Sequence, residues 1–347
     1  MRRALALTAA VGAAALTRRA LRRRIRRSPL WPLPALETPV SGHSPRRALR
    51  ARIASRTEPA DGVLCLTLES AELPGWSPGA HVDVTLPSGL VRQYSLCGDP
   101  ALAGTYRIAV RLVETGRGGS REAHARLAEG AELVLRPPRN RFELLPAPSY
   151  AFVAGGIGIT PVLPMLRAAT AAGADWTLLY GGRSRATMPF LEELAAYGDR
   201  VTVVPEDEAG LPDLAPLAGI GPDTLVYCCG PEPLMRAVTE AVPDPAAVRL
   251  ERFAPAEAGP ARPFAVELGR SGRVVEVGAQ ESALAAVRRV LPNTPYSCEQ
   301  GFCGTCQHRV LAGEVEHRDE LLTDAERADS MLLCVSRAAS DRLTLDL

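Results

Sequence analysis

The sequence predicts a multi-domain chain: an antiparallel β-barrel, an α/β domain with a parallel sheet, and a small C-terminal domain around a cysteine loop. Three observations predict this order. Short alternating strands with Gly and Pro punctuation fill residues 48–147. Apolar strands alternate with Ala-rich helices over 148–255. Residues 262–347 contain three cysteines in a C-x4-C-x2-C spacing. Residues 1–47 form a basic extension and linker ahead of the barrel.

The composition limits the classes of partner. The 347 residues suffice for two or three separate cores. All 40 basic residues are Arg, and nine of them lie in residues 1–30, which hold no acid. The rest of the chain therefore carries 31 Arg against 39 acids, a charge of −8. An acidic body with few aromatic residues excludes nucleic acid as a partner.

The N-terminal extension has one apolar run, Ala4–Leu16, which is too short to cross a bilayer. An Arg cluster directly behind it disfavours an exported signal peptide. The pattern fits an Arg-rich amphipathic segment on an anionic membrane surface, and a start without defined structure fits equally well. We expect a cytoplasmic protein, with residues 1–30 offering peripheral contact to the cytoplasmic face of a membrane.

The barrel sequence contains two motifs that suit a flavin. In the first, Arg92-Gln-Tyr94-Ser95-Leu96, an aromatic ring, a hydroxyl and a cation lie together at a strand end. Tyr94 would stack on the isoalloxazine, Ser95 would reach the polar atoms of the ring, and Arg92 would pair with the phosphate. An ordinary barrel strand with an outward Arg and a core Tyr is the alternative.

The second motif is the loop Gly116-Arg-Gly118-Gly119-Ser120, which precedes a helical pattern over Arg121–Leu127. Backbone N–H groups at a helix N-terminus, with Ser120 as N-cap, form a phosphate cradle. A flexible hairpin turn is the alternative. Two such motifs in a chain that also has the cysteine loop favour a flavin.

The α/β segment alternates four apolar strands with helices. The predicted strands are Tyr150–Val153, Trp176–Tyr180, Val201–Val204 and Thr224–Cys228, and the predicted helices include Pro161–Ala172 and Pro189–Tyr197. Such alternation predicts a parallel sheet, whose ligands bind at the carboxyl edge of the strands.

The first of these strands runs into a glycine-rich turn, Gly155-Gly156-Ile-Gly158-Ile-Thr160-Pro. It is not the G-x-G-x-x-G fingerprint, but its glycines permit close backbone approach. Thr160 is predicted to cap the helix, whose N-terminus then faces a pyrophosphate. A tight strand–helix turn without a ligand is the alternative.

Two further positions lie at the same predicted edge. The last strand ends in Cys229-Gly230-Pro231, which brings a thiol and a glycine to the ligand side of the sheet. Arg183 follows the second strand and is placed to reach the ribose or adenine side of a nucleotide. A buried cysteine before a turn and an ordinary surface arginine are the alternatives.

The C-terminal domain begins with a hairpin pattern around Gly272 and a short helix over Glu281–Val290. Its predicted metal ligands are Cys298, Cys303, Cys306 and Cys334. Their spacing is that of plant-type [2Fe–2S] ferredoxins and predicts one-electron transfer in a reducing compartment. A structural zinc site, or four unrelated buried thiols, are the alternatives. The remaining cysteines lie in apolar runs and are expected to be buried.

These motifs, in this order, resemble the phthalate dioxygenase reductase family, which includes vanillate demethylase reductase subunits and belongs to the ferredoxin–NADP reductase superfamily. The similarity covers roughly residues 48–347. The segments that carry it, besides the glycine and cysteine motifs above, are Pro78-Gly-Ala-His-Val-Asp-Val84, Arg92-Gln-Tyr-Ser-Leu-Cys97 and Pro138-Arg-Asn-Arg-Phe142.

The resemblance implies FMN rather than FAD, NADH rather than NADPH, a C-terminal ferredoxin of β-grasp fold, and a separate terminal oxygenase as electron acceptor. Two features depart from the family pattern: the basic extension and the segment Gly181–Arg185. Because Arg185 offers a cation for a 2′-phosphate, NADPH stays an alternative.

The predicted mechanism passes hydride from NADH to the flavin, with Cys229 and Ser95 at the reacting groups, and then single electrons to the cluster. The acceptor is expected to be a ring dioxygenase, an O-demethylase or a cytochrome P450, and the chain a monomer. Three rival functions stay open: an FAD-dependent, NADPH-using reductase of a multicomponent monooxygenase, a cluster-bearing redox sensor, and a zinc-stapled binding module.

Overall fold

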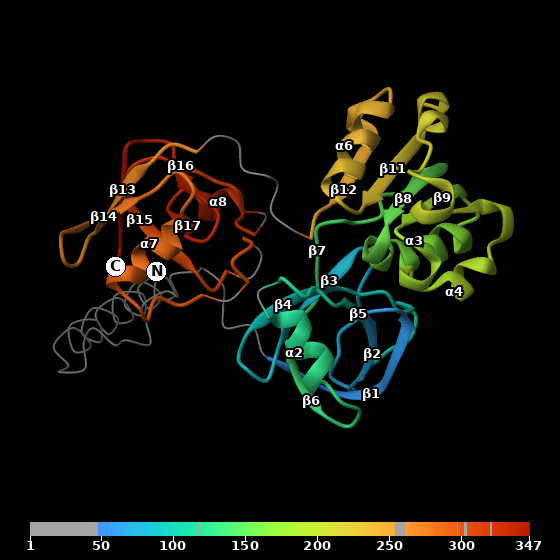
Figure 1. Ribbon diagram of the computed structural model, residues 1–347, viewed down its shortest axis with the longest axis horizontal. Helices are drawn as coiled ribbons and strands as arrows, with labels where there is room; N and C mark the ends of the chain where they lie inside the picture. Colours follow the sequence, from blue (N-terminus) through green and yellow to red (C-terminus); the bar gives the residue numbers. More distant parts are fainter. Residues whose placement is uncertain (1–47, 117, 254–260, 297, 302–303, 320) are drawn as a thin grey trace, which may run out of the picture. The chain divides into compact units, whose positions relative to one another are not determined.

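The computed structural model describes residues 48–116, 118–253, 261–296, 298–301, 304–319 and 321–347 (Figure 1). The N-terminal extension therefore lies outside the described residues, and so do Arg117 and Cys303. Within the described ranges, no helix has the length and apolar character needed to cross a bilayer. The described chain forms three principal sheets, which pack around several hydrophobic cores.

The first sheet is an antiparallel barrel. Its elements are β1 (Leu49–Ala60), β2 (Val63–Glu69), β3 (Ala80–Thr85), β4 (Val91–Ser95), β5 (Thr105–Arg111), α2 (Gly119–Arg126), β6 (Glu132–Leu135) and β7 (Arg139–Asn140). The strand order is β4-β3-β6-β1-β2-β5, and β7 pairs with β3. A bridge between Leu96 and Ile108 joins the two ends of this order, and the Cys97 N–H donates to the Arg107 carbonyl at 2.8 Å. This closure confirms the predicted barrel.

The long first strand, β1, buries one of its two faces in the barrel. Leu49, Ala51 and Ile53 are buried, whereas Arg50 and Arg52 between them are exposed. This alternation places one side of the strand in the barrel core. No strand is predicted here from the sequence, because Arg, Thr and Glu make up much of β1 and hide its apolar period.

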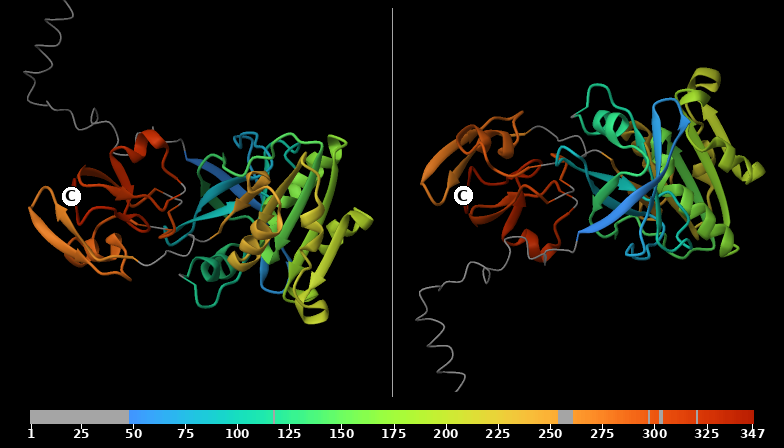
Figure 2. Two further views of the ribbon diagram at one scale, coloured as in Figure 1. Left: turned by 90° about the horizontal axis from the view of Figure 1, so that it is seen from above. Right: turned by 90° about the horizontal axis from the view of Figure 1, so that it is seen from below.

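The second sheet is parallel throughout, as predicted. Its elements are β8 (Ser149–Gly155), α3 (Ile159–Ala171), β9 (Asp175–Gly182), α4 (Leu191–Ala195), β10 (Val201–Pro205), α5 (Glu206–Ala209), β11 (Thr224–Cys229), α6 (Glu232–Ala241) and β12 (Val248–Glu251). The strand order is β10-β9-β8-β11-β12. Figure 2 shows these strands side by side in both views. Helix α3 packs on one face and α6 on the other, so the carboxyl ends of β8, β9 and β11 meet at one edge.

One predicted helix is shorter than expected. The pattern over Pro189–Tyr197 predicted a helix, but α4 covers only Leu191–Ala195. Phe190 has a φ of 68°, a left-handed conformation that a helix cannot contain. The Phe190 ring instead lies under the Arg107 guanidinium, 5.0 Å from its centroid.

The barrel and the parallel sheet share one hydrophobic core. Val63, Cys97 and Phe142 of the barrel side pack in the same buried cluster as Phe152 and Tyr227 of the sheet. Phe142 meets Tyr227 edge to face, with ring centroids 5.3 Å apart. Shared apolar burial of this kind fixes the two domains as one body, which a site formed by both requires.

The third sheet has mixed direction. Its elements are β13 (Phe264–Leu268), β14 (Arg273–Val277), α7 (Ala283–Val290), β15 (Gln307–Ala312), β16 (Val315–Glu316), α8 (Asp324–Arg327), β17 (Ser330–Leu332), β18 (Arg337–Ala338) and β19 (Arg342–Leu345). The order is β14-β13-β19-β15-β17, with β13 and β19 parallel and the other pairs antiparallel. Helix α7 packs on this sheet, as in the expected β-grasp fold. Its start is set by Ser282, whose side chain accepts a hydrogen bond from the Ala285 N–H.

An ion-pair network beside the shared core gives a prediction about stability. Glu193 accepts hydrogen bonds from Arg107, at 2.9 Å, and from Arg167, and all three side chains are about three-quarters buried. Replacing Glu193 with Ala leaves two guanidinium groups, each about three-quarters buried, without this carboxylate. We expect the Glu193→Ala variant to lose about 1–3 kcal/mol of unfolding free energy in urea titrations. The neighbouring exposed Glu192→Ala is the matched control, and equal losses in both variants would contradict the role given to Glu193.

Candidate functional site

The end of β4 and the start of α2 lie together on the barrel. A Cβ built on Gly119 would lie 2.3 Å from Arg92 Nε, so the Arg92 side chain lies directly over the first turn of this helix. Gly118 has a φ of 80° and is the N-cap of α2. A guanidinium and free helix N–H groups in one place suit a phosphate, which fits the proposed binding of the flavin phosphate here.

The other residues of the β4 motif differ in their burial and in the direction of their side chains. Tyr94 is partly buried against the barrel core, and burial raises the pKa of its hydroxyl, which stays protonated at neutral pH. Ser95 is buried, and its Oγ points out of the barrel toward the parallel sheet, where it meets Glu251. Leu96 is fully buried in the barrel core and its N–H donates to the Ala80 carbonyl. The Leu96 side chain therefore does not face the site.

The predicted capping role of Ser120 is wrong. Helix α2 begins at Gly119, and Ser120 already lies in its first turn. Its Oγ accepts a hydrogen bond from the Val113 N–H at 3.0 Å, which ties the two ends of the loop together. The glycines, which tolerate the positive φ that this turn needs, carry the cap instead.

Glu251 brings two predicted residues together. Its Oε2 accepts from Ser95 Oγ at 3.2 Å and lies 4.0 Å from Cys229 Sγ. Cys229 and Glu251 are register partners on β11 and β12. Burial and then the charge of Glu251 raise the pKa of Cys229 well above its ordinary value, so the thiol is neutral. A hydroxyl, a thiol and a carboxylate thus converge between the barrel and the sheet.

Sequence reasoning missed Glu251. It belongs to no motif, and its hydroxyl partner Ser95 is 156 residues away in the chain. One signal was available: an acidic residue at the carboxyl end of an apolar run, next to the strand that ends in Cys229. Parallel strands bring such ends to one edge.

The glycine-rich turn after β8 packs directly on the end of β11. A Cβ on Gly158 would lie 2.2 Å from the Cys229 carbonyl oxygen, and one on Gly155 would lie 2.6 Å from Pro231 Cδ. A Cβ on Gly230 would approach the Gly155 backbone to 3.1 Å. These contacts require glycine and bring both predicted segments into one structure.

The predicted capping role of Thr160 is also wrong. Helix α3 begins at Ile159 after a single 3-10 turn over Gly156–Gly158, and no side chain caps it. Thr160 is buried, and its Oγ1 donates to the Ile157 carbonyl at 2.9 Å. The side chain therefore braces the turn from within, which leaves ligand contact to the backbone of the turn.

A cavity of about 570 Å³ opens over this turn. Its volume lies in the usual range for sites of small molecules and cofactors. The predicted residues that line it are Gly155, Gly156, Arg183 and Pro231. Four charged residues line it in total, namely Asp61 and Arg111 from the barrel and Arg183 and Glu206 from the sheet. We call it the nucleotide cavity.

The described cysteines of the C-terminal loop are buried close together. Cys298, Cys306 and Cys334 are each less than a tenth exposed. A hydrogen bond from the Cys334 thiol lowers the pKa of Cys306, and the Cys298 and Cys306 thiols raise that of Cys334. The three described thiols do not by themselves make a metal-ligand group, and Cys303 lies outside the described residues.

The glycines of this loop lie where a bound cluster needs them. Gly301 and Gly304 have φ values of 81° and 72°, and a Cβ on Gly304 would lie 2.7 Å from Leu321 Cδ2. Such turns direct backbone N–H groups inward, where thiolate and sulfide charge needs hydrogen bonds. Buried thiols in this spacing and glycines in this conformation fit a [2Fe–2S] cluster.

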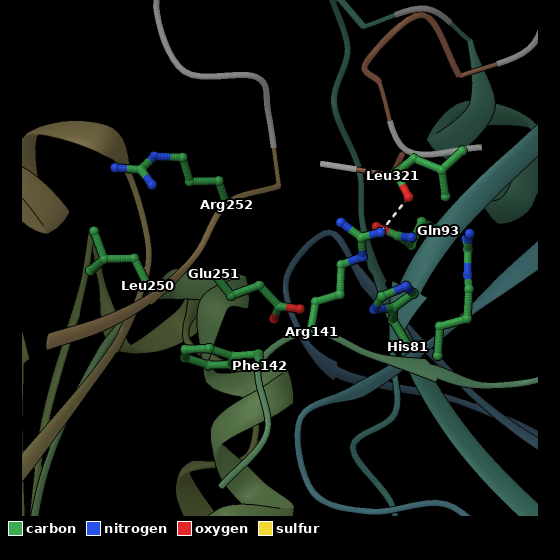
Figure 3. A pocket seen from close by; sticks show the side chains of 9 residues that line it. His81, Gln93, Arg141, Phe142, Leu250, Glu251, Arg252 and Leu321 are labelled. Carbon is green, nitrogen blue, oxygen red and sulfur yellow. Dashed lines mark hydrogen bonds between the residues drawn. The ribbon is translucent and has the colours of Figure 1, made fainter. Parts of the chain in front are cut away.

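Strand β4 links the barrel site to the cysteine loop. Val91, its first residue, packs against Cys298 in a small buried cluster. Arg141, beyond β7, donates a hydrogen bond to the Leu321 carbonyl (Figure 3). The strand that carries Arg92, Tyr94 and Ser95 thus begins at a predicted cluster ligand.

A small cavity of about 40 Å³ lies at this junction. Figure 3 shows Arg141, His81 and Glu251 around it, whereas the Arg252 side chain points away. His81 is the register partner of Ser95 on β3. Burial, with the charges of Arg139 and Arg141, lowers the pKa of His81 to about 3. His81 is therefore a neutral imidazole at physiological pH.

Comparison with known families matches two segments. Residues 266–339 match the 2Fe-2S iron-sulfur cluster binding domain, and residues 152–240 match the oxidoreductase NAD-binding domain. These segments hold Cys298, Cys306 and Cys334 and the glycine-rich turn.

Comparison with individual proteins extends over most of the chain. It is 43% identical to the phenoxybenzoate dioxygenase subunit beta of Ectopseudomonas oleovorans over 301 residues, which are 83% of this chain and 94% of the relative. Among solved structures it is similar to phthalate dioxygenase reductase, a modular structure for electron transfer from pyridine nucleotides to [2Fe–2S], with 35% identity and a TM-score of 0.66. That match covers 87% of this chain and 98% of the other.

A third match is an intact type IV self-sufficient cytochrome P450 monooxygenase, at 41% identity and a TM-score of 0.70. The match covers 92% of this chain and 44% of the monooxygenase, so the chain spans less than half of that protein.

The buried His81 gives a prediction about pH. An unfolded His has a pKa of about 6.5, so below that pH the unfolded chain binds a proton that the folded chain binds only near pH 3. Stability therefore falls as the pH drops from 6.5 toward 3, and His81 accounts for a loss of about 2 kcal/mol at pH 5. In urea titrations, the free energy of unfolding of the unmodified protein should be lower at pH 5 than at pH 7. In the His81→Gln variant we expect this decrease to be smaller by about 2 kcal/mol. His124→Gln is the control, and an unchanged pH dependence in His81→Gln would place the titrating group elsewhere.

Proposed function

This chain belongs to the family of phthalate dioxygenase reductase-like proteins, and from that premise we propose that it is the reductase component of an oxygenase system. It takes electrons from NADH, passes them through FMN to a [2Fe–2S] cluster, and delivers them to a separate acceptor. The acceptor is a terminal oxygenase or a cytochrome P450, as the names of its relatives indicate.

The observation that carries this proposal is the position of β4. Arg92 lies over the first turn of α2, Ser95 meets the sheet through Glu251, and Val91 contacts Cys298. One five-residue strand therefore borders all three redox sites. We assign residues 48–147 to flavin binding, 148–255 to the nucleotide and 262–347 to the cluster.

The barrel residues hold the flavin at its two ends. Arg92 and the N–H groups at Gly118 and Gly119 would bind the phosphate, because a guanidinium lies here beside a helix N-terminus. Tyr94 would pack against the ring, and the Ser95 hydroxyl, which donates to Glu251, would lie at its polar edge. The bound flavin supplies hydride acceptance and one-electron release, and the protein supplies position.

The sheet residues hold and orient the nucleotide. The backbone at Gly155 and Gly156 receives the pyrophosphate, and Pro231 borders the cavity beside it. Cys229 lines the nicotinamide position as a neutral thiol, and Glu251 orients it together with the Ser95 hydroxyl. Hydride transfer requires no proton transfer by these side chains. Their proposed role is to align the nicotinamide ring with the flavin ring.

The cysteine loop holds the cluster through Cys298, Cys303, Cys306 and Cys334, and its exposed edge meets the acceptor. Redox encounters of this kind use small, transient interfaces. Plant-type clusters have reduction potentials of about −400 mV, close to those of flavin and nicotinamide, so electron transfer between them changes the free energy little.

We further propose that the chain is a monomer and that residues 1–30, outside the described residues, contact an anionic membrane from the cytoplasmic side. Nine Arg residues without an acid support this contact. In a sedimentation assay with vesicles containing phosphatidylserine, we expect the full chain to pellet with the vesicles. A chain lacking residues 1–30 should stay in the supernatant. Equal behaviour of the two chains would contradict the membrane contact.

The proposed function is tested by an anaerobic visible spectrum before and after stoichiometric NADH. Flavin and iron–sulfur bands that both bleach are expected. A coloured protein that does not respond to either NADH or NADPH would contradict the reductase and favour a redox sensor. A colourless protein with bound zinc would contradict the cluster itself.

The two cofactor sites should be separable by substitution. The Arg92→Ala variant is expected to lose most of its flavin absorbance and keep the iron–sulfur bands, because it removes the cation of the phosphate site. The Cys306→Ala variant should show the reverse. Cys228→Ala, which removes a buried thiol within the parallel sheet, is the control and should keep both sets of bands. Loss of flavin in all three variants would indicate general unfolding and contradict the assignment.

A further inference from the structure

The turn around Cys306 carries a buried side-chain amide, that of Gln307. The Gln307 N–H donates to the Gly304 carbonyl at 3.1 Å, which closes a turn that contains Cys306. The Gln307 side chain folds back over this turn, because its Oε1 lies 4.0 Å from the position of a Cβ on Gly304. The amide therefore lies beside the part of the cysteine loop that leads into Cys306.

The N–H groups of this amide have no acceptor within the described part of the chain. Gln307 is only 9% exposed, and its Nε2 is buried without a hydrogen-bond partner among the described residues. A buried amide in this state has lost its hydrogen bonds to water and gained none in return, so native structures rarely contain one. An orphaned buried donor points to an acceptor outside the polypeptide, either a bound group or a water molecule.

The neighbours of Gln307 make a water molecule the poorer acceptor. Leu332 is its register partner on β17, and the two side chains share one face of the sheet. Leu332 is fully buried, and Leu321 Cδ2 lies 2.7 Å from the same Cβ position on Gly304. A buried water needs two to four polar partners, which leucine side chains do not supply. Sulfur atoms held in the cysteine loop are the acceptors that fit.

A second glutamine of the same loop gives a useful contrast. The backbone N–H of Gln300 donates to Cys298 Sγ at 3.4 Å, so the loop already directs one donor at a ligand sulfur. The side-chain amide of Gln300 is engaged elsewhere, because its Nε2 donates to the Phe253 carbonyl at 3.3 Å. Of these two glutamines, only Gln307 has its side-chain donor left for the cluster.

We propose that the Gln307 side-chain amide donates a hydrogen bond to a sulfur atom of the [2Fe–2S] cluster or of its thiolate ligands, and thereby raises the reduction potential of the cluster. Reduction adds one negative charge to the cluster, and a donor stabilises the more negative state more strongly. A higher potential favours the cluster over the flavin as the place of the electron. The inference rests on the proposed function, since it concerns the cluster at the end of the proposed electron path.

The test is a spectroelectrochemical titration of the purified holoprotein with dithionite and mediators, followed at the iron–sulfur bands. Gln307→Leu keeps most of the side-chain volume and removes the amide. At a fixed potential, we expect the ratio of reduced to oxidised cluster to fall about tenfold in this variant, which corresponds to a shift of about −59 mV for one electron. Gln300→Leu makes the same replacement in the same loop and should keep the potential of the unmodified chain.

Two results of this titration would overturn the inference. One is an unchanged potential in Gln307→Leu, and the other is an equal fall in Gln307→Leu and Gln300→Leu. Urea unfolding of the same variants separates a structural role from the proposed one. A loss of unfolding free energy in Gln307→Leu with an unmoved potential would make Gln307 a packing residue and would also overturn the inference.

A measurement on the unmodified chain covers the case in which Gln307→Leu takes up no cluster. Cell-free synthesis with glutamine that carries nitrogen-15 in its side-chain amide leaves the backbone nitrogens unlabelled. Pulsed EPR of the dithionite-reduced cluster should then show a weak nitrogen-15 coupling, because a hydrogen-bonded sulfur shares its spin density with the donor. The coupling should persist in Gln300→Leu. Its absence from the unmodified chain would indicate that the amide meets water and would overturn the inference.

Dithionite separates this inference from the proposed function, because it reduces the cluster without NADH or flavin. A potential that falls in Gln307→Leu, in a chain that NADH and NADPH do not bleach, would contradict the reductase and support the hydrogen bond. Bleaching by NADH together with an unmoved potential would support the reductase and overturn the hydrogen bond.

Discussion

The contact between Val91 and Cys298 is the constraint on which the proposed electron path depends. Val91 opens β4, and within four residues the same strand reaches Ser95, which meets Glu251 of the parallel sheet. A strand rises about 3.3 Å per residue, so the three sites adjoin within about 15 Å of rigid backbone. Because both neighbours of β4 are tied to a closed barrel, the barrel side of this spacing is fixed.

The shared core of barrel and sheet supplies the second requirement, a fixed alignment of two rings. Phe142 and Tyr227 meet across it, and Glu193 joins Arg107 of the barrel to Arg167 of the sheet. Hydride transfer depends on close alignment of the reacting atoms. The neutral state of the Cys229 thiol fits this role, because an uncharged side chain can contact the nicotinamide ring without placing a negative charge beside it.

The fold and the cofactor motifs were readable from the sequence because they are local. The glycine-rich turn, the Arg92–Leu96 motif and the cysteine spacing each lie within a dozen residues. Glu251 was not found, since its partner Ser95 comes from a distant segment and no short pattern marks it. The two caps failed for a related reason: Ser120 and Thr160 stand at plausible positions, but their hydroxyls bond elsewhere.

The central claim is that electrons cross from flavin to cluster within one chain, along the junction at β4. Anaerobic stopped-flow reduction by stoichiometric NADH, followed at the iron–sulfur absorbance over a wide range of protein concentrations, tests it most directly. The account predicts a first-order rate constant for cluster reduction that is the same at every concentration. A rate constant that rises in proportion to protein concentration would show transfer between molecules and contradict it.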